Sequence, residues 1–155
     1  MNADWQLLFV ELESNDPSAV DLETDLKSEG RMKLATDYLE EANAVVPRIT
    51  PEQGIEFHKA GGAVFIDVRD SSDVAKTGTI AGALRIPRGF IEFAADETHP
   101  LHNSGMKKDK TIVIVCAAGG MAALSGKTLN EMGYNNVHNV GGIKDWINAG
   151  GEMET

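Results

Sequence analysis

Cysteine is nearly absent from this sequence of 155 residues, in which Cys116 is the single thiol. One cysteine cannot form an internal disulfide, so the fold must rely on a hydrophobic core, and this length suffices for one such domain. Long apolar runs are also missing, since no stretch approaches the roughly 20 residues of a membrane-spanning helix. The first residues lack the basic region of a signal peptide. These absences predict a cytoplasmic protein with no membrane partner.

Positive charge is scarce and dispersed. The formal net charge is −10, with 24 acidic against 14 basic side chains. Residues 1–46 hold 11 acidic and 3 basic residues, whereas residues 47–155 hold 13 and 11. Neither part has the basic stripe that a nucleic-acid backbone requires, so we expect no nucleic-acid partner.

The charge difference predicts two regions, an acidic helical extension over residues 1–46 and a main domain over residues 47–155. In the extension, Trp5, Leu8 and Phe9 fall at helical spacing. A second helical pattern covers residues 32–44. An apolar helix face of this kind usually packs on its own domain, and an arm that docks a protein partner is the alternative.

Strand and helix patterns alternate from residue 47 onward. Thr50, Pro51 and Gln53 form a helix-start signal, with a cap, a proline at the first helical position and a capping-box glutamine. Short apolar strands are predicted at residues 63–68, 83–86, 111–115 and 137–140, with helices between them. This order predicts an α/β fold, a parallel sheet of about five strands with helices on both faces.

The single cysteine follows the strongest predicted strand and precedes a small, flexible turn and a helix. In a parallel sheet, ligands bind beyond the carboxyl ends of the strands. Gly119 and Gly120 would let successive N–H groups point at one spot, a nest that binds anions and favours a nucleophilic thiolate at Cys116. A buried structural cysteine is the competing interpretation of the same pattern.

Four segments together resemble the rhodanese-like (sulfurtransferase) family. Residues 65–70 read F-I-D-V-R-D, like the strand that opens these domains, and residues 78–87 read G-T-I-A-G-A-L-R-I-P, similar to their G-H-I-P-G-A segment. Residues 115–121 read V-C-A-A-G-G-M, like the active-site loop, and residues 139–146 read N-V-G-G-I-K-D-W, like the closing segment. Order and spacing agree with the family over residues 47–152.

The resemblance implies that Cys116 takes sulfane sulfur from a donor such as thiosulfate, becomes a persulfide and passes the sulfur to cyanide or a thiol. It implies no metal or organic cofactor. The persulfide would be stabilised by the loop that follows the cysteine, made of Ala117, Ala118, Gly119, Gly120, Met121 and Ala122. The alternative is a non-enzymatic rhodanese-like module that binds a protein partner through residues 1–46 or senses sulfur.

The loop departs from the family pattern at two positions. Many members carry arginine or a hydroxyl residue five positions after the cysteine, often followed by serine, where this chain has Met121 and Ala122. Anion binding must then rest on backbone N–H groups, the helix end and a remote arginine, which favours less charged donors such as persulfides. Related phosphatases need an arginine at the position of Ala122 to clamp phosphate, so phosphatase activity is not expected.

Three charged residues outside the loop are further candidates. Asp67 and Arg69 stand at the end of a predicted strand, where they could reach the site or tie loops together as an ion pair. Arg88 follows a proline and could lean over the pocket to supply positive charge. His99 and His102 lack further ligands at a metal-binding spacing, so no metal site is predicted.

Overall fold

A computed structural model of the chain describes residues 32–155. Of these, residues 32–38 belong to one compact unit and residues 39–155 to a second. The predicted helix with Trp5, Leu8 and Phe9 lies outside the described residues. The second predicted helix is present as α3 (Ala35–Val45), and it ends just before Val46, because a residue that precedes proline disfavours the helical conformation. The boundary between the units falls within α3.

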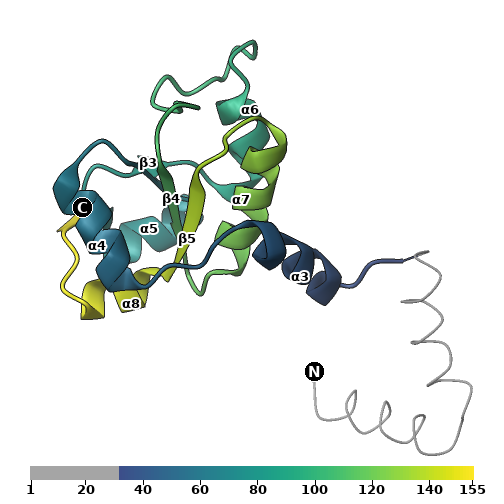
Figure 1. Ribbon diagram of the computed structural model, residues 1–155. Helices are drawn as coiled ribbons and strands as arrows, with labels where there is room; N and C mark the ends of the chain where they lie inside the picture. Colours follow the sequence, from purple (N-terminus) through teal and green to yellow (C-terminus); the bar gives the residue numbers. More distant parts are fainter. Residues whose placement is uncertain (1–31) are drawn as a thin grey trace, which may run out of the picture. The chain divides into compact units, whose positions relative to one another are not determined.

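A parallel sheet of four strands forms the centre of residues 39–155, in the order β3-β1-β4-β5 (Figure 1). The strands are β1 (Val64–Asp67), β3 (Leu84–Arg85), β4 (Ile112–Cys116) and β5 (Val137–Gly142). The α/β class and the parallel direction agree with the prediction, whereas the sheet has four strands instead of about five. A single parallel bridge between Arg48 and Asn139 continues the sheet beyond β5.

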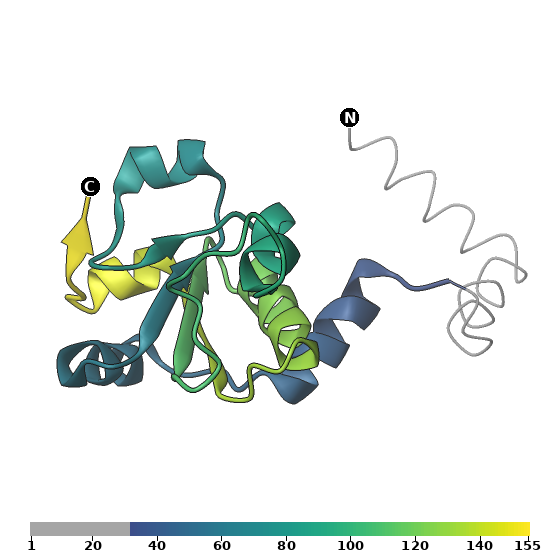
Figure 2. The same cartoon turned by 90° about the horizontal axis from the view of Figure 1, so that it is seen from above.

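Helices cover both faces of this sheet (Figures 1 and 2). One face carries α7 (Gly120–Glu131) and α6 (Ile91–Ala95), which follows the short helix η1 (Arg88–Phe90). The other face carries α4 (Pro51–Ala60) and α8 (Ile143–Asn148). The start of α4 has the predicted capping box, because Thr50 accepts from the Gln53 N–H and Gln53 accepts from the Thr50 N–H.

Two features of the fold, a helix and a pair of strands, were not anticipated from local patterns. Helix α5 (Ser71–Thr77) follows β1 directly, and β2 (Thr79–Ile80) pairs antiparallel with β6 (Met153–Glu154) at the end of the chain. Both are short, and the β2–β6 pair joins segments far apart in the sequence, so sequence periodicity carries little information about them.

The core has two parts, one on each side of the sheet. Side chains alternate along β4, so Ile112, Ile114 and Cys116 belong to the cluster beneath α6 and α7. Val113 and Val115 belong to the cluster that contains Trp146 of α8. All five residues of β4 are buried, as expected for a central parallel strand.

Candidate functional site

Cys116 is the last residue of the central strand β4, and its side chain lies on the α7 side of the sheet. It stands at the carboxyl edge, where β4 leaves the sheet and turns into α7. The β-branched run of residues 112–115 forms the strand that fixes this position. The predicted placement of the cysteine between a buried strand and a turn is therefore confirmed.

The loop after Cys116 directs backbone N–H groups at the sulfur. The amide nitrogen of Gly119 lies 3.0 Å from Sγ, and that of Ala122 lies 3.4 Å from it. Gly119 has φ 107° and ψ −14°, a left-handed backbone conformation that residues other than glycine rarely adopt. The residues that follow open α7, whose N-terminal N–H groups add partial positive charge at the same spot.

The side chains of the loop after Cys116 are small or apolar. Cys116 itself is 1% exposed, whereas Ala117, Ala118 and Met121 of its loop are exposed. Gly120 is half-buried and Ala122 is buried. We call the buried sulfur, together with the Gly119 and Ala122 amides directed at it, the cup.

Asn139 on β5 supports this cup, although no sequence pattern other than the closing motif singled it out. Its side-chain amide donates to the Gly119 carbonyl oxygen at 2.8 Å, and its oxygen accepts from the Gly141 N–H at 2.8 Å. The side chain is 1% exposed. It acts where the β4–β5 register shifts after Ile114, so it links the cysteine loop to an irregular strand end.

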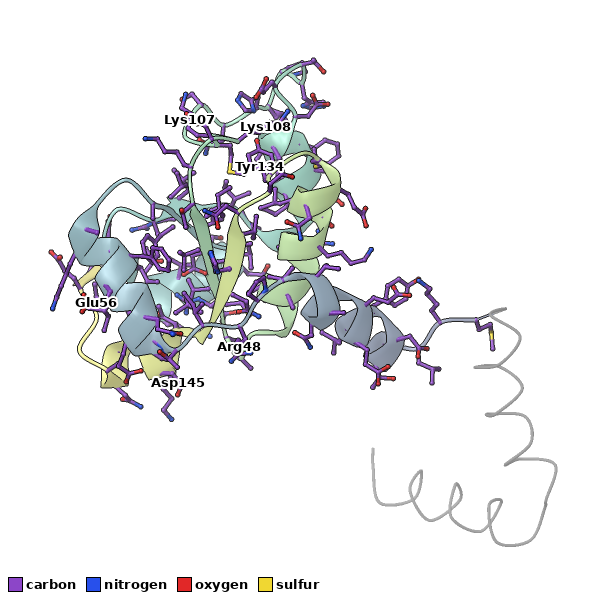
Figure 3. All side chains as sticks on the ribbon, viewed as in Figure 1. Arg48, Glu56, Lys107, Lys108, Tyr134 and Asp145 are labelled. Carbon is purple, nitrogen blue, oxygen red and sulfur yellow. The ribbon has the colours of Figure 1, made fainter. Side chains whose placement is uncertain are left out.

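Arg48 is a second residue that sequence reasoning missed. Its guanidinium lies against Gly119 and Gly141, where a Cβ atom on either glycine would come within 2.5 Å of a guanidinium nitrogen. Figure 3 shows Arg48 at the end of the sheet from which the loop between β4 and α7 projects. Pairing between residues 47–49 and Asn139 brings it there, so no local sequence signal could have revealed the contact.

Asp67 and Arg69 form a buried cluster with residues 77–79. Arg69 donates to both Asp67 carboxylate oxygens, to Thr77 and to the Gly78 carbonyl oxygen, and Thr79 donates to Asp67 at 2.8 Å. Asp67 is two residues after Phe65 on β1, so both side chains lie on the α8 side of the sheet, the face opposite Cys116. These contacts favour the structural alternative for the pair, in which it ties β1 to the loop before β2.

The Arg88 side chain contacts α6 and α7. Its guanidinium lies 3.4 Å from Glu92 and 3.3 Å from the hydroxyl of Thr128. Within residues 32–155 it makes no hydrogen bond or ion pair to the cysteine loop. A role for Arg88 in anion binding stays a prediction, and the structure brings Arg48 to the loop instead.

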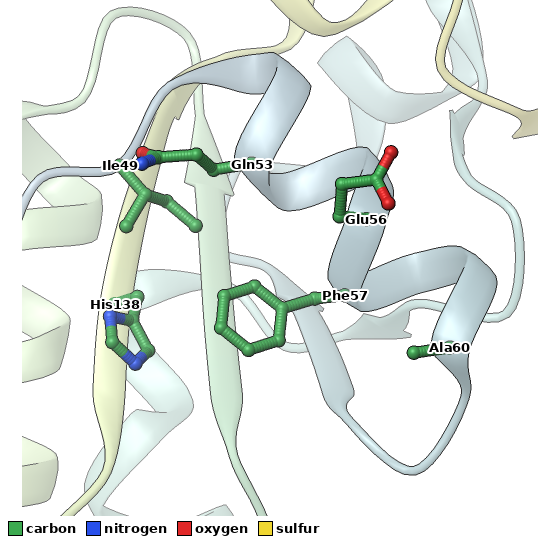
Figure 4. Close-up of a pocket in the computed structure, with 6 residues that line it drawn as sticks. All are labelled: Ile49, Gln53, Glu56, Phe57, Ala60 and His138. Atoms are coloured by element: carbon green, nitrogen blue, oxygen red, sulfur yellow. The ribbon is translucent and has the colours of Figure 1, made fainter.

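A separate groove of about 590 Å³ runs between α4 and the edge of β5. Figure 4 shows the side chains of Ile49, Phe57 and His138 facing the same space, while the Glu56 carboxylate points away from it. Burial lowers the pKa of His138, which favours the neutral form of its ring. The groove holds no nucleophile, and it does not include the cysteine loop.

Residues 39–155 thus form a parallel α/β domain in which two backbone amides contact a cysteine sulfur at the carboxyl edge of a central strand. The chain belongs to the rhodanese-like domain family, which matches residues 50–149. The match covers the strand with Asp67, the cysteine loop and α8. Within residues 32–155, no helix is both long enough and apolar enough to cross a bilayer.

Named relatives agree with this membership. A thiosulfate sulfurtransferase, GlpE, from Pseudomonas putida is 32% identical over 100 residues, which cover 64% of this chain and 83% of GlpE. A solved protein of unknown function from Rhodopseudomonas palustris, described as a possible tyrosine phosphatase, is 34% identical to this chain, with a TM-score of 0.74. The match covers 79% of this chain and 96% of the solved protein. The polysulfide-sulfur transferase homodimer of Wolinella succinogenes is 26% identical with TM-score 0.61, covering 75% and 83%.

Proposed function

We propose that this protein is a sulfurtransferase that carries sulfane sulfur as a persulfide on Cys116. The single observation that carries the proposal is the pair of amides, Gly119 and Ala122, directed at the cysteine sulfur. Amide groups held in this way stabilise a sulfur anion without an added cation. Relatives named as thiosulfate and polysulfide-sulfur transferases support the same class of reaction.

The first step is attack by the Cys116 thiolate on the outer sulfur of thiosulfate. A new S–S bond forms, the S–S bond of thiosulfate breaks, and sulfite leaves with the electron pair. The product is Cys–S–S⁻, whose outer sulfur lies about 2 Å from Sγ and so extends from the buried atom into the cup. We expect the N–H groups of Gly119, Gly120 and the first turn of α7 to donate to this outer sulfur.

The second step returns the cysteine to its thiolate. Cyanide or a thiolate acceptor attacks the outer sulfur, the persulfide S–S bond breaks, and its electrons return to Cys116. The residue carries the sulfur itself, so neither step requires a metal or an organic cofactor. We propose the cytoplasm as the compartment, because a lone reactive thiol persists in a reducing environment.

Mass spectrometry of the intact protein after incubation with thiosulfate or polysulfide tests this function. We expect a gain of one sulfur atom, its removal by cyanide, and no gain in Cys116→Ser, which should retain the native thermal midpoint. If the folded wild-type protein gains no sulfur from either donor, the persulfide mechanism is wrong.

A second candidate, a non-enzymatic rhodanese-like module, is favoured by two observations. Cys116 is only 1% exposed, and the exposed Met121 offers no charge to a donor. For such a module the acidic residues 1–46 would supply the partner-binding segment. The same mass measurement separates the two candidates, since a pure binding module needs no covalent intermediate.

A further inference from the structure

The cysteine loop lacks a charged side chain, yet one arginine contacts it directly. Arg48 is exposed, and its guanidinium lies across Gly119 and Gly141, two residues with φ values of 107° and 90°. A side chain at either glycine would occupy the space that the guanidinium fills. Because neither glycine has a Cβ, there is space for the Arg48 guanidinium beside the loop.

Arg48 differs from the other three arginines of residues 32–155, each of which has a carboxylate partner. Arg69 pairs with Asp67 at 2.7 Å, Arg85 with Glu154 at 3.6 Å, and Arg88 with Glu92 at 3.4 Å. Within the same described part of the chain, the Arg48 guanidinium forms no ion pair. No carboxylate of residues 32–155 neutralises this charge, which can therefore attract an anion from solution.

The geometry limits how far this charge can lie from the sulfur. The Gly119 nitrogen is 3.0 Å from Sγ, and the Arg48 nitrogen Nη1 is 2.5 Å from the position of a Cβ on the same residue. With standard bond lengths, Nη1 and Sγ are no more than about 8 Å apart. That separation is no larger than about one Debye length at physiological ionic strength, so salt does not fully screen the interaction.

We propose that Arg48 is the donor-binding cation of this site and that it selects oxyanionic sulfur donors such as thiosulfate. This inference rests on the proposed function. Arg48 supplies, from outside the loop, the positive charge that Met121 and Ala122 do not supply within it. Sequence reasoning alone favoured less charged donors, and an unpaired guanidinium beside the cup reverses that preference.

Steady-state kinetics with two donors of different charge test the proposal. Thiosulfate is a dianion, whereas the persulfide of cysteamine carries no net charge. In Arg48→Gln we expect the KM for thiosulfate to rise about 10-fold, because one charge-assisted contact is lost. The kcat/KM for cysteamine persulfide should stay within about 2-fold, and Arg48→Lys, which keeps the charge without the planar fork, should recover part of the thiosulfate KM.

Lys59→Gln is the matched control, since it removes one exposed positive charge near the last turn of α4 and should leave both donors unchanged. Equal losses with both donors in Arg48→Gln would show that Arg48 only shapes the loop, and no loss with either would remove it from the site. Both results overturn the inference. Failure of the wild-type protein to take sulfur from any donor would instead refute the sulfurtransferase itself.

Discussion

The strands β4 and β1 end at the same edge of the sheet, but different interactions fix the residues at the two ends. After β4, the cysteine loop carries no charged side chain. Most of its residues are small, and two of its amides are directed at one sulfur. At the end of β1, Asp67 and Arg69 are charged, and they are 0% and 3% exposed. The Arg69 guanidinium donates to the Asp67 carboxylate, the Thr77 hydroxyl and the Gly78 carbonyl oxygen, so most of its donors are already engaged within the protein.

This difference teaches that charge at a strand end is a poor guide to function. A buried ion pair with satisfied hydrogen bonds fixes the loops around it, and breaking it is costly. A cup of amides is pre-organised without charged side chains and can receive an anion that forms during a reaction. We therefore expect the two regions to respond to substitution in different ways, one mainly in stability and the other mainly in sulfur transfer.

The largest effect on stability is expected from Asp67→Ala. The substitution leaves the buried Arg69 guanidinium without its carboxylate, which should lower the free energy of unfolding by about 3–5 kcal/mol. Urea denaturation at constant pH measures this loss. The molecules that remain folded should still acquire sulfur on Cys116, because Asp67 belongs to the opposite face of the sheet.

Asp70→Ala is the control for this change. Asp70 is an exposed carboxylate before α5 with no side-chain capping bond, so its removal should alter the unfolding free energy by less than about 0.5 kcal/mol. Similar small losses in both variants would show that the Asp67 cluster does not hold the fold.

Gly119→Ala is expected to lower stability by less than Asp67→Ala does, and to lower sulfur transfer as well. The left-handed backbone disfavours any Cβ, and the new methyl group would meet the Arg48 guanidinium, so stability should fall by about 1–3 kcal/mol. Sulfur transfer should fall further than stability explains, because the Gly119 N–H turns away from Sγ. Denaturation and single-turnover persulfide formation, measured on the same sample, separate the two losses.

Gly120→Ala provides the comparison within the same loop. A Cβ there would lie 3.6 Å from Leu39, an ordinary contact, and the residue opens a helix that alanine favours. We expect native stability and native persulfide formation. Equal damage from both alanines would mean that loop size, rather than the direction of one amide, controls the site.

The smallest effect is expected from Thr79→Val, which removes a single buried hydroxyl of nearly the same shape. Thr79 donates to Asp67, so the unfolding free energy should fall by about 1–2 kcal/mol while sulfur transfer per folded molecule stays unchanged. Thr79→Ser keeps the donor and should recover most of the loss in denaturation experiments. A loss of transfer without a loss of stability would contradict the separation of the two regions.

Local patterns accounted for several parts of the structure. The capping box at Thr50, the buried strand before Cys116 and the glycine turn into α7 are short-range features, because each depends on neighbouring residues and on their preferred backbone conformations. The order of four motifs was enough to indicate the family. Helix α5 and the β2–β6 pair were missed because both are short.

By itself, the sequence determined the α/β class, the place of Cys116 at a strand end and the uncharged character of its loop. Only the tertiary structure decided which charges reach that loop. Arg48 and Cys116 meet at Gly119 because Pro47 and Ile49 pair with Asn139, and Asp67 with Arg69 turns to the other face of the sheet. Such contacts join residues that are distant in the chain, and their geometry is set by packing and strand register rather than by local propensity.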